Sequence, residues 1–305
     1  MFGPVGQGNS RGMTTMLDDI AVSEAPVPKK LSPASAAVAQ YLNVQIEAIF
    51  DGDAGLRRFE DPIHDTRVAI RRLRSTLRVF GSEFDPAAAN SMEDDLKWFA
   101  GLLGEVRDCQ VQARRFSAAV DTLPDVLVLG PVRARIRDDL RAVERPARER
   151  VTEAMASPRC LAMLAELRRW KVDPPLVPDL RNAQLDQQAR RAYRKADRRL
   201  GTALRSDDDA LLHRARKAAK RARYAAELIT AGSGSTSAKR KVKTYKRIQT
   251  VLGDHQDTVV AAGVLRQMGA AAGTTAGENG FTFGLLYARE QQIARECREA
   301  ASRLL

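Results

Sequence analysis

The chain has 305 residues, of which 44% are hydrophobic and only 5% aromatic, and it carries a formal net charge of +12. This length can bury a sizeable core, and low aromatic content with abundant Ala, Leu and Arg favours helices over sheets. No apolar run approaches the roughly 18 residues of a membrane helix, and no signal peptide is recognisable, which argues against membrane and secreted proteins. The three cysteines are far apart and read as free thiols of a reducing cytoplasm.

The pattern along the chain predicts a tail followed by helices. Residues 1–33 are rich in Gly, Pro, Ser and Met without periodicity, which indicates a disordered tail. Pro124, Gly130 and Pro131 mark breaks between helices, and the proline-rich segment 172–180 is typical of a joint. No alternating strand pattern occurs, so we expect an all-α fold. The expected helices are 34–50, 61–80, 86–101, 104–121, 131–156, 158–171, 181–205, 207–230, 238–253, 255–270 and 279–303.

Two separate motifs recur at a single spacing. His64 opens HDTRVAIRRLRSTLRVF and His213 opens HRARKAAKRARYAAELI, and each is followed by an LG-x-x-x-D block that ends at Asp108 or Asp257. Both pairs lie 149 residues apart without a gap, which indicates an internal duplication. We expect two pseudo-symmetric helical bundles with a basic cleft between them. The expected organisation is repeat one at about 34–156, a linker at about 157–180 and repeat two at about 181–305.

The positive charge is concentrated in three segments. Residues 64–80, 213–229 and 239–247 carry net charges of +4, +5 and +6, so the remainder of the chain is slightly acidic. Charge that is gathered in this way points to a polyanionic partner. The last segment, KRKVKTYKR, corresponds to the acidic NSMEDDLKW of repeat one and is therefore not a shared feature of the repeats.

Each repeat places cations one turn apart on one side of a helix. Like charges at this spacing repel by a few tenths of a kcal/mol per pair, and this stripe of repeat one contains no acid. The stripes therefore predict an anionic ligand, which Arg binds well because its planar fork donates two hydrogen bonds at once. The first stripe is about 21 Å long, which suits a linear polyanion. The stripes consist of His64, Arg67, Arg71, Arg74 and Arg78, and of His213, Arg216, Lys220 and Arg223.

The motifs H-x-x-R-V-A-x-R-R-L-R-x-x-L-R-x-F and L-K-W-F-x-x-L-L-G-x-x-R-D resemble the CHAD domain, the conserved histidine α-helical domain. The resemblance covers about residues 34–305. It implies two four-helix-like halves around a basic cavity, binding of inorganic polyphosphate and association with cytoplasmic polyphosphate granules. It also adds Lys97 and Lys246 to the two stripes as ligand-facing residues. Arg72, Lys217, Arg221 and Lys243 are additional candidates, whereas Glu227 stands where repeat one has Arg78.

Other functions have weaker support in the sequence. A nucleic-acid-binding protein is the main alternative, although the stripes lack the interleaved aromatic residues on which bases stack. A phosphohydrolase comes third, because Arg67 and Arg71 beside a histidine could hold one phosphoryl group. A metal site is disfavoured because arginines surround the histidines. We therefore expect a non-enzymatic protein with no cofactor and no metal.

The LG-x-x-x-D blocks have structural interpretations. Gly104 and Gly253 would allow a close helix approach or a helix junction, and Asp108 and Asp257 would orient Arg or Lys of the stripes. His255 has no partner in the other repeat, so we expect it to be a surface or capping residue and not a ligand.

Overall fold

Three helices of the chain begin with the same local signal. In the computed structural model, which describes residues 31–304, Ser32, Asp85 and Ser157 each precede a proline that opens a helix. Each side chain accepts a hydrogen bond from the backbone N–H three residues further on, at 3.1, 2.8 and 3.3 Å. Such a cap stabilises a helix by about 1 kcal/mol, and proline fits the first turn because no N–H is needed there.

Residues 31–304 form nine α-helices, two short 3-10 helices and no strand beyond one isolated bridge between Phe84 and Leu176. The predicted all-α fold is thereby confirmed. No helix among these residues has the length and apolarity to cross a membrane. Most of the predicted tail lies outside the described residues. The helices are α1 (Pro33–Arg57), α2 (Ile63–Val79), α3 (Pro86–Asp121), α4 (Val132–Ala156), α5 (Pro158–Val172), α6 (Asn182–Ala203), α7 (Asp209–Ser233), α8 (Thr236–Ala272) and α9 (Phe281–Ser302), with 3-10 helices at Gly81–Glu83 and Asp125–Leu127.

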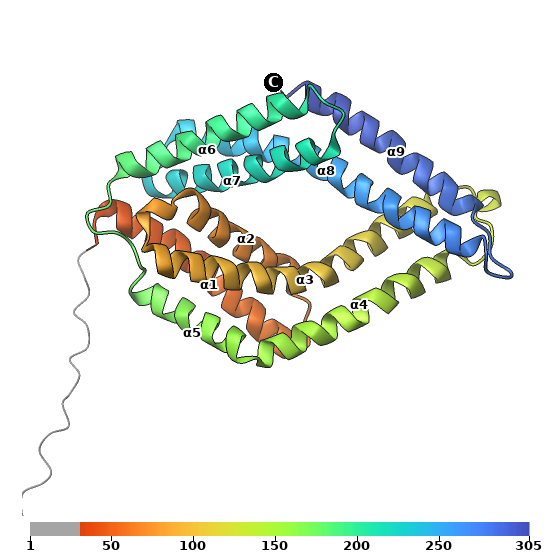
Figure 1. Ribbon diagram of the computed structural model, residues 1–305, viewed down its shortest axis with the longest axis horizontal. Coiled ribbons are helices and arrows are strands. Elements are labelled where there is room, and N and C mark those ends of the chain that lie inside the picture. The colour runs from red at the N-terminus through yellow and green to blue at the C-terminus, as the bar shows by residue number, and fades with distance from the viewer. Residues whose placement is uncertain (1–30, 305) are drawn as a thin grey trace, which may run out of the picture. The chain divides into compact units, whose positions relative to one another are not determined.

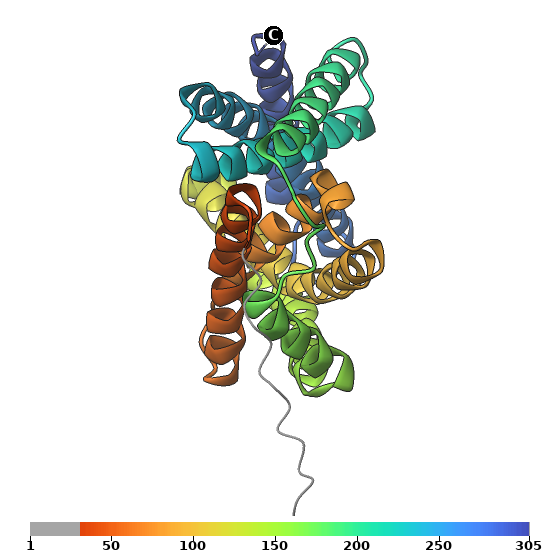
Figure 2. The ribbon, with the colours of Figure 1, turned by 90° about the vertical axis from the view of Figure 1, so that its left-hand side faces the viewer.

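The order of the helices follows the sequence duplication (Figure 1). α1 and α6 begin 149 residues apart, and so do α4 and α9. The turned view places α6, α7 and the first half of α8 above the helices of the first repeat (Figure 2). α5 has no counterpart in the second repeat among residues 31–304, which makes the two halves unequal.

The predicted helix breaks near Gly104 and Gly253 are wrong. α3 and α8 pass through these glycines as continuous helices of 36 and 37 residues. A glycine within a helix costs only about 1 kcal/mol relative to alanine. Packing at both ends of each helix outweighs this cost. α3 contributes Leu103 to one core cluster and Phe116 to a second one. α8 contributes Leu265 to that second cluster and Leu252 to a third.

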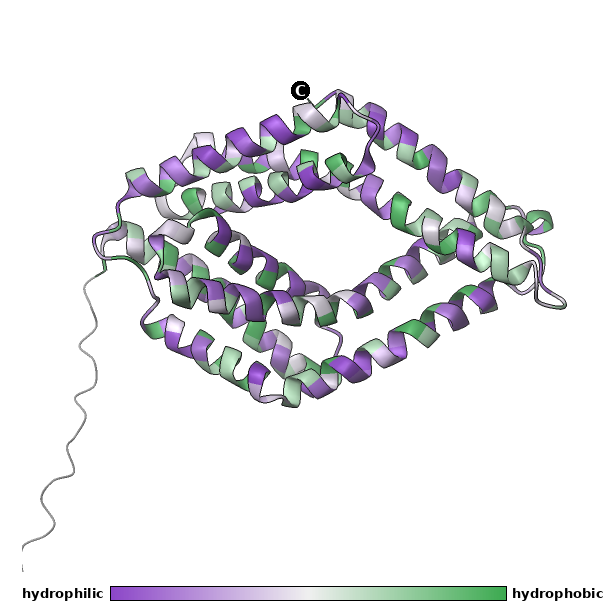
Figure 3. Ribbon diagram, in the orientation of Figure 1, coloured by the Kyte–Doolittle hydropathy of each residue, from purple (hydrophilic) through white to green (hydrophobic). Residues whose placement is uncertain are grey.

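Among residues 31–304, three apolar clusters hold the helices together, and the helices carry hydrophobic as well as hydrophilic residues (Figure 3). The first fills the first repeat around the buried Trp170 and Phe99, and the third joins α6, α7 and α8 around Tyr245. The second is distal and joins the end of α3 and the start of α4 to the end of α8 and the start of α9. The long helices therefore connect each repeat to a shared apolar contact.

An ion pair between the repeats reinforces this distal contact. Arg115 of α3 donates from Nε and Nη2 to the two carboxylate oxygens of Glu290 on α9, at 2.8 and 2.5 Å. The Glu290 side chain is only 3% exposed. A buried carboxylate depends on its partner, because its water shell has been removed.

We predict that Glu290→Gln lowers the free energy of unfolding by about 2 kcal/mol, because it leaves the Arg115 guanidinium half-buried without its counter-ion. Urea denaturation measures this change. Glu149→Gln, which removes an exposed partner of Arg145 on α4, is the control and is expected to leave stability unchanged. Equal stability of both variants would contradict the role of the Arg115–Glu290 pair.

Candidate anion-binding site

A cavity of about 430 Å³ lies where the two repeats meet, between α2, α3 and α7. Seven of its eight lining residues are cations and none is acidic. All seven belong to the set that the sequence singled out. The lining residues are Arg71, Arg74, Ser75, Arg78, Lys97, Lys217, Lys220 and Arg221.

Packing on the opposite sides of α2 and α7 turns the cations toward this cavity. Ile70 and Leu73 of α2 are both 0% exposed, and they anchor that helix in the first core cluster. The equivalent face of α7 consists of alanines, including the buried Ala219 and Ala222. Small side chains let α7 pack closely, so cations from both repeats face one cavity.

Arg71 and Lys220 have no ionic partner among the described residues, and Arg71 Nε is buried without a hydrogen bond. Burial and the nearby Arg216 and Arg71 lower the pKa of Lys220 to about 7. A lysine has such a low pKa only where burial and neighbouring positive charges make its protonated form costly. An anionic ligand would supply the counter-ion that both side chains lack.

The structure corrects the expectation that no acid compensates the first stripe. Glu93 of α3 lies 2.7 Å from Arg74 and 2.8 Å from Arg78. Those two arginines can bind an anion while they remain paired with Glu93, because two guanidinium groups and one carboxylate keep a net positive charge. Glu93 thus reduces the positive charge of this part of the stripe without cancelling it.

Arg72 and Arg223 do not line the cavity. They lie 3.1 and 2.8 Å from Glu227 and near the ring of Tyr224. Glu227, which stands where repeat one has Arg78, therefore forms ion pairs with two of the candidate cations. This pairing favours a structural role for Arg72 and Arg223.

Arg67 and Arg216 each lie over the glycine of an LG-x-x-x-D block. Arg67 Nη1 donates to the Gly104 carbonyl oxygen at 2.9 Å and lies 3.4 Å from the Asp108 carboxylate. A methyl group added at Gly104 would lie 3.4 Å from Arg67 Nη1, and one at Gly253 would lie 3.4 Å from Arg216 Nε. The glycines therefore make room for guanidinium groups within continuous helices.

His64 and His213 lie near the starts of α2 and α7 and do not line the cavity. Burial, followed by the charge of Arg107, lowers the pKa of His64. Burial, followed by the charge of Lys217, lowers the pKa of His213. Arg107 of α3 was not among the sequence candidates, because its counterpart in repeat two is Gln256.

Lys97 of α3 and its counterpart Lys246 of α8 differ in their position relative to the cavity. Lys97 lines the cavity, whereas Lys246 and Lys243 are exposed on α8 and are absent from its lining. The expectation of a surface position for His255 is wrong, because this residue is 2% exposed. Its Nε2 lies 3.3 Å from the Asp209 carboxylate at the start of α7, so it connects two helices of repeat two.

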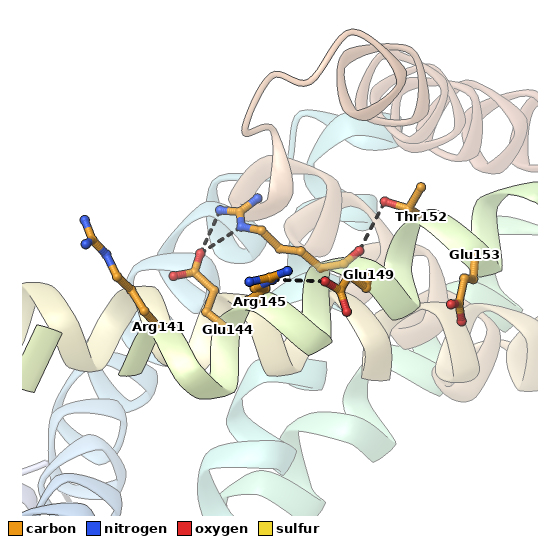
Figure 4. Close-up of a pocket in the computed structure, with 7 residues that line it drawn as sticks. Arg141, Glu144, Arg145, Glu149, Thr152 and Glu153 are labelled. Atoms are coloured by element: carbon orange, nitrogen blue, oxygen red, sulfur yellow. Dashed lines mark hydrogen bonds and ion pairs between the residues drawn. The ribbon is translucent and has the colours of Figure 1, made fainter. Parts of the chain in front are cut away.

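A hollow along α4 has a different charge pattern. It measures about 770 Å³ and is lined by three arginines, three glutamates and one threonine. Figure 4 shows Arg145 paired with Glu149, and a second arginine reaching the carboxylate of Glu144. Its cations are balanced by acids four residues away, so this surface offers little to an anion.

A smaller hollow of about 200 Å³ shares Arg78 and Arg221 with the cavity and adds Arg191 and Lys195 of α6. These last two residues were not among the candidates predicted from the sequence. Comparing α6 with α1 could have revealed them, because α6 contains six Lys and Arg where α1 contains one. Among residues 31–304 no group of three His, Cys, Asp or Glu is arranged to hold a metal ion.

The fold and this site define an all-helical protein of two repeats with a cation-lined cavity, and comparison with known proteins assigns its family. The family model of the CHAD domain matches residues 40–266. The proteins MT2285 and Rv2226 from two Mycobacterium tuberculosis strains are 32% identical over 292 residues, covering 92% of this chain and 54% of each relative. The chain therefore belongs to the CHAD domain family and spans about half the length of these curated relatives.

Solved structures have the same fold. PptA from Streptomyces chartreusis matches with a TM-score of 0.75 and 23% identity, covering 90% of this chain and 99% of that chain. The crystal structure of the CHAD domain from the plant Ricinus communis matches with a TM-score of 0.66 and 25% identity, covering 87% of this chain and 91% of that one.

We predict that Gly101→Ala and Gly104→Ala differ in stability. Gly101 has no atom within 4 Å of an added methyl group, so alanine there should raise the free energy of unfolding by about 0.5–1 kcal/mol. At Gly104 an added methyl group would lie in van der Waals contact with the Arg67 guanidinium, at 3.4 Å, which restricts that side chain, so the gain should be smaller. Urea denaturation distinguishes the two variants, and equal gains would contradict the proposed use of Gly104.

We predict that Lys220 makes stability depend on pH. The pKa of Lys220 is about 7 in the folded chain, against 10.5 for an unperturbed lysine. Between these values the unfolded chain binds more protons, so the free energy of unfolding rises with pH. Urea denaturation from pH 7 to about pH 9 should show a rise in the wild type that Lys220→Met lacks. Parallel curves would contradict the lowered pKa.

Proposed function

We propose that this chain binds inorganic polyphosphate in the cavity between α2, α3 and α7 and does not catalyse a reaction. The observation that carries the proposal is a lining of seven cations without an acid, contributed by both repeats. Arg71 and Lys220 would contact phosphate oxygens directly, and Arg74 and Arg78 would bind the ligand while they remain paired with Glu93. Phosphate oxygens suit this lining because Arg and Lys donate charge-assisted hydrogen bonds to them.

Membership of the CHAD domain family supports the same ligand, and the absence of aromatic residues from the lining favours polyphosphate over nucleic acid. Single-stranded nucleic acids bind proteins largely by stacking bases on aromatic rings. The lining also contains no carboxylate or imidazole to orient an attacking water, which disfavours a phosphohydrolase. Binding of this kind would associate the protein with polyphosphate granules in the cytoplasm.

We further propose that residues 34–305 act as one CHAD domain, in which two repeats and the linker between them form a single ligand site. Each repeat alone contributes only part of the lining. α2 and α3 supply Arg71, Arg74, Arg78 and Lys97, whereas α7 supplies the remaining cations.

We predict that Arg71→Gln/Lys220→Gln weakens binding of labelled long-chain polyphosphate. Each charge-assisted hydrogen bond contributes about 1.5 kcal/mol or more, so each lost cation should reduce affinity at least about tenfold. Fluorescence anisotropy at two salt concentrations measures the change, and wild-type affinity should fall steeply with salt.

The control is Arg145→Gln/Arg214→Gln, which removes the same charge from exposed positions outside the cavity. Its affinity should stay close to the wild-type value. If duplex DNA or single-stranded RNA displaced polyphosphate at equal phosphate concentration, the nucleic-acid alternative would replace this proposal. Unchanged binding by Arg71→Gln/Lys220→Gln would show that the cavity is not the site.

A further inference from the structure

α6 carries cations on a face whose counterpart on α1 is exposed and uncharged. The buried residues of α6 match the buried residues of α1 at an offset of 151 residues. At this offset Arg191 and Lys195 correspond to Gln40 and Val44, and all four residues are exposed. The exposed face of this helix has thus gained positive charge in the second repeat.

Exposure alone does not explain this charge. An uncovered face needs only polar residues, yet α6 contains six Lys and Arg and is largely hydrophilic (Figure 3). Neighbouring like charges on one helix repel, so solubility alone does not account for them.

These cations lie beside the candidate site. Arg191 and Lys195 line a groove of about 200 Å³ between α6, α2 and α7, and this groove has no acidic residue in its lining. Arg78 and Arg221 line both the groove and the cavity. The charge of Arg199, followed by burial and the charge of Arg221, lowers the pKa of Lys195. Lys195 therefore lies in a positive field that continues from the cavity.

We propose that the groove between α6, α2 and α7 is a second subsite, which a long polyphosphate chain enters after it has filled the cavity. This inference rests on the proposed function of the cavity and adds a determinant of chain length to it. Tripolyphosphate would occupy the cavity alone, while a long chain would pass Arg78 and Arg221 and reach Arg191 and Lys195. Each additional phosphate contact releases counterions and so increases both affinity and its dependence on salt.

α6 itself supplies a matched control. Arg190 and Arg194 are exposed on the same helix and do not line the groove. The groove variant Arg191→Gln/Lys195→Gln and the control variant Arg190→Gln/Arg194→Gln each remove two positive charges. Titration of wild type and both variants with tripolyphosphate and with long-chain polyphosphate, over a range of salt concentrations, tests the proposal.

All three proteins should bind tripolyphosphate equally. Wild type and the control variant should bind the long chain more tightly than tripolyphosphate, and the groove variant should lose at least about threefold of that gain. Its slope of log affinity against log salt should become shallower by about 1 to 2, because two phosphate contacts are missing.

Equal long-chain affinity of the groove and control variants would overturn the second subsite. A loss of RNA affinity in the groove variant with unchanged long-chain polyphosphate affinity would overturn it as well, because the groove would then be a nucleic-acid site. If the wild type bound neither polyphosphate, the proposed function itself would fail, which is a different result from loss of the chain-length effect.

Discussion

The central constraint on this structure is the repulsion between cations of the two repeats, which face each other across one cavity. Arg71 comes from the first repeat and Lys220 from the second, and neither has an ionic partner among the described residues. The fold holds them together although burial lowers the pKa of Lys220 to about 7. Repulsion would move these cations apart unless interactions elsewhere in the fold held their helices in place.

Those interactions lie in the core clusters to which α3 and α8 extend. Both helices pass through the glycine of an LG-x-x-x-D block and end in the distal cluster, where the Arg115–Glu290 pair joins the repeats. The same glycines leave room for Arg67 and Arg216. Continuous helices thus connect apolar contact at one end with unpaired positive charge at the other, and an anion bound in the cavity would stabilise the folded state further.

Much of this arrangement could be predicted because it depends on local periodicity. The stripe from Arg67 to Arg78 and its recurrence after His213 follow from helical spacing, and the structure brings three residues of the first stripe and Lys220 of the second to one cavity. The pairing of Glu93 with Arg74 could not be predicted, because it depends on how α3 packs against α2.

The remaining differences also arise from tertiary structure. A glycine in a sequence is compatible with either a helix break or a close approach of another group. At Gly104 and Gly253 the helices are continuous because both of their ends pack into core clusters. His255 is buried because Asp209 from another helix faces it. The charged groove lies between α6, α2 and α7, so it depends on how helices of the two repeats pack together. Symmetry in the sequence therefore predicted the shared cavity but not the features in which the repeats differ.

The most direct measurement of the central claim is the number of protons taken up when polyphosphate binds. Isothermal titration calorimetry at about pH 8, in buffers of different ionisation enthalpy, gives this number for wild type and for Lys220→Met. Because a phosphate beside Lys220 would raise its pKa from about 7, wild type should take up about one proton more than the variant. Equal uptake by the two proteins would contradict the account, since the ligand would then bind away from Lys220.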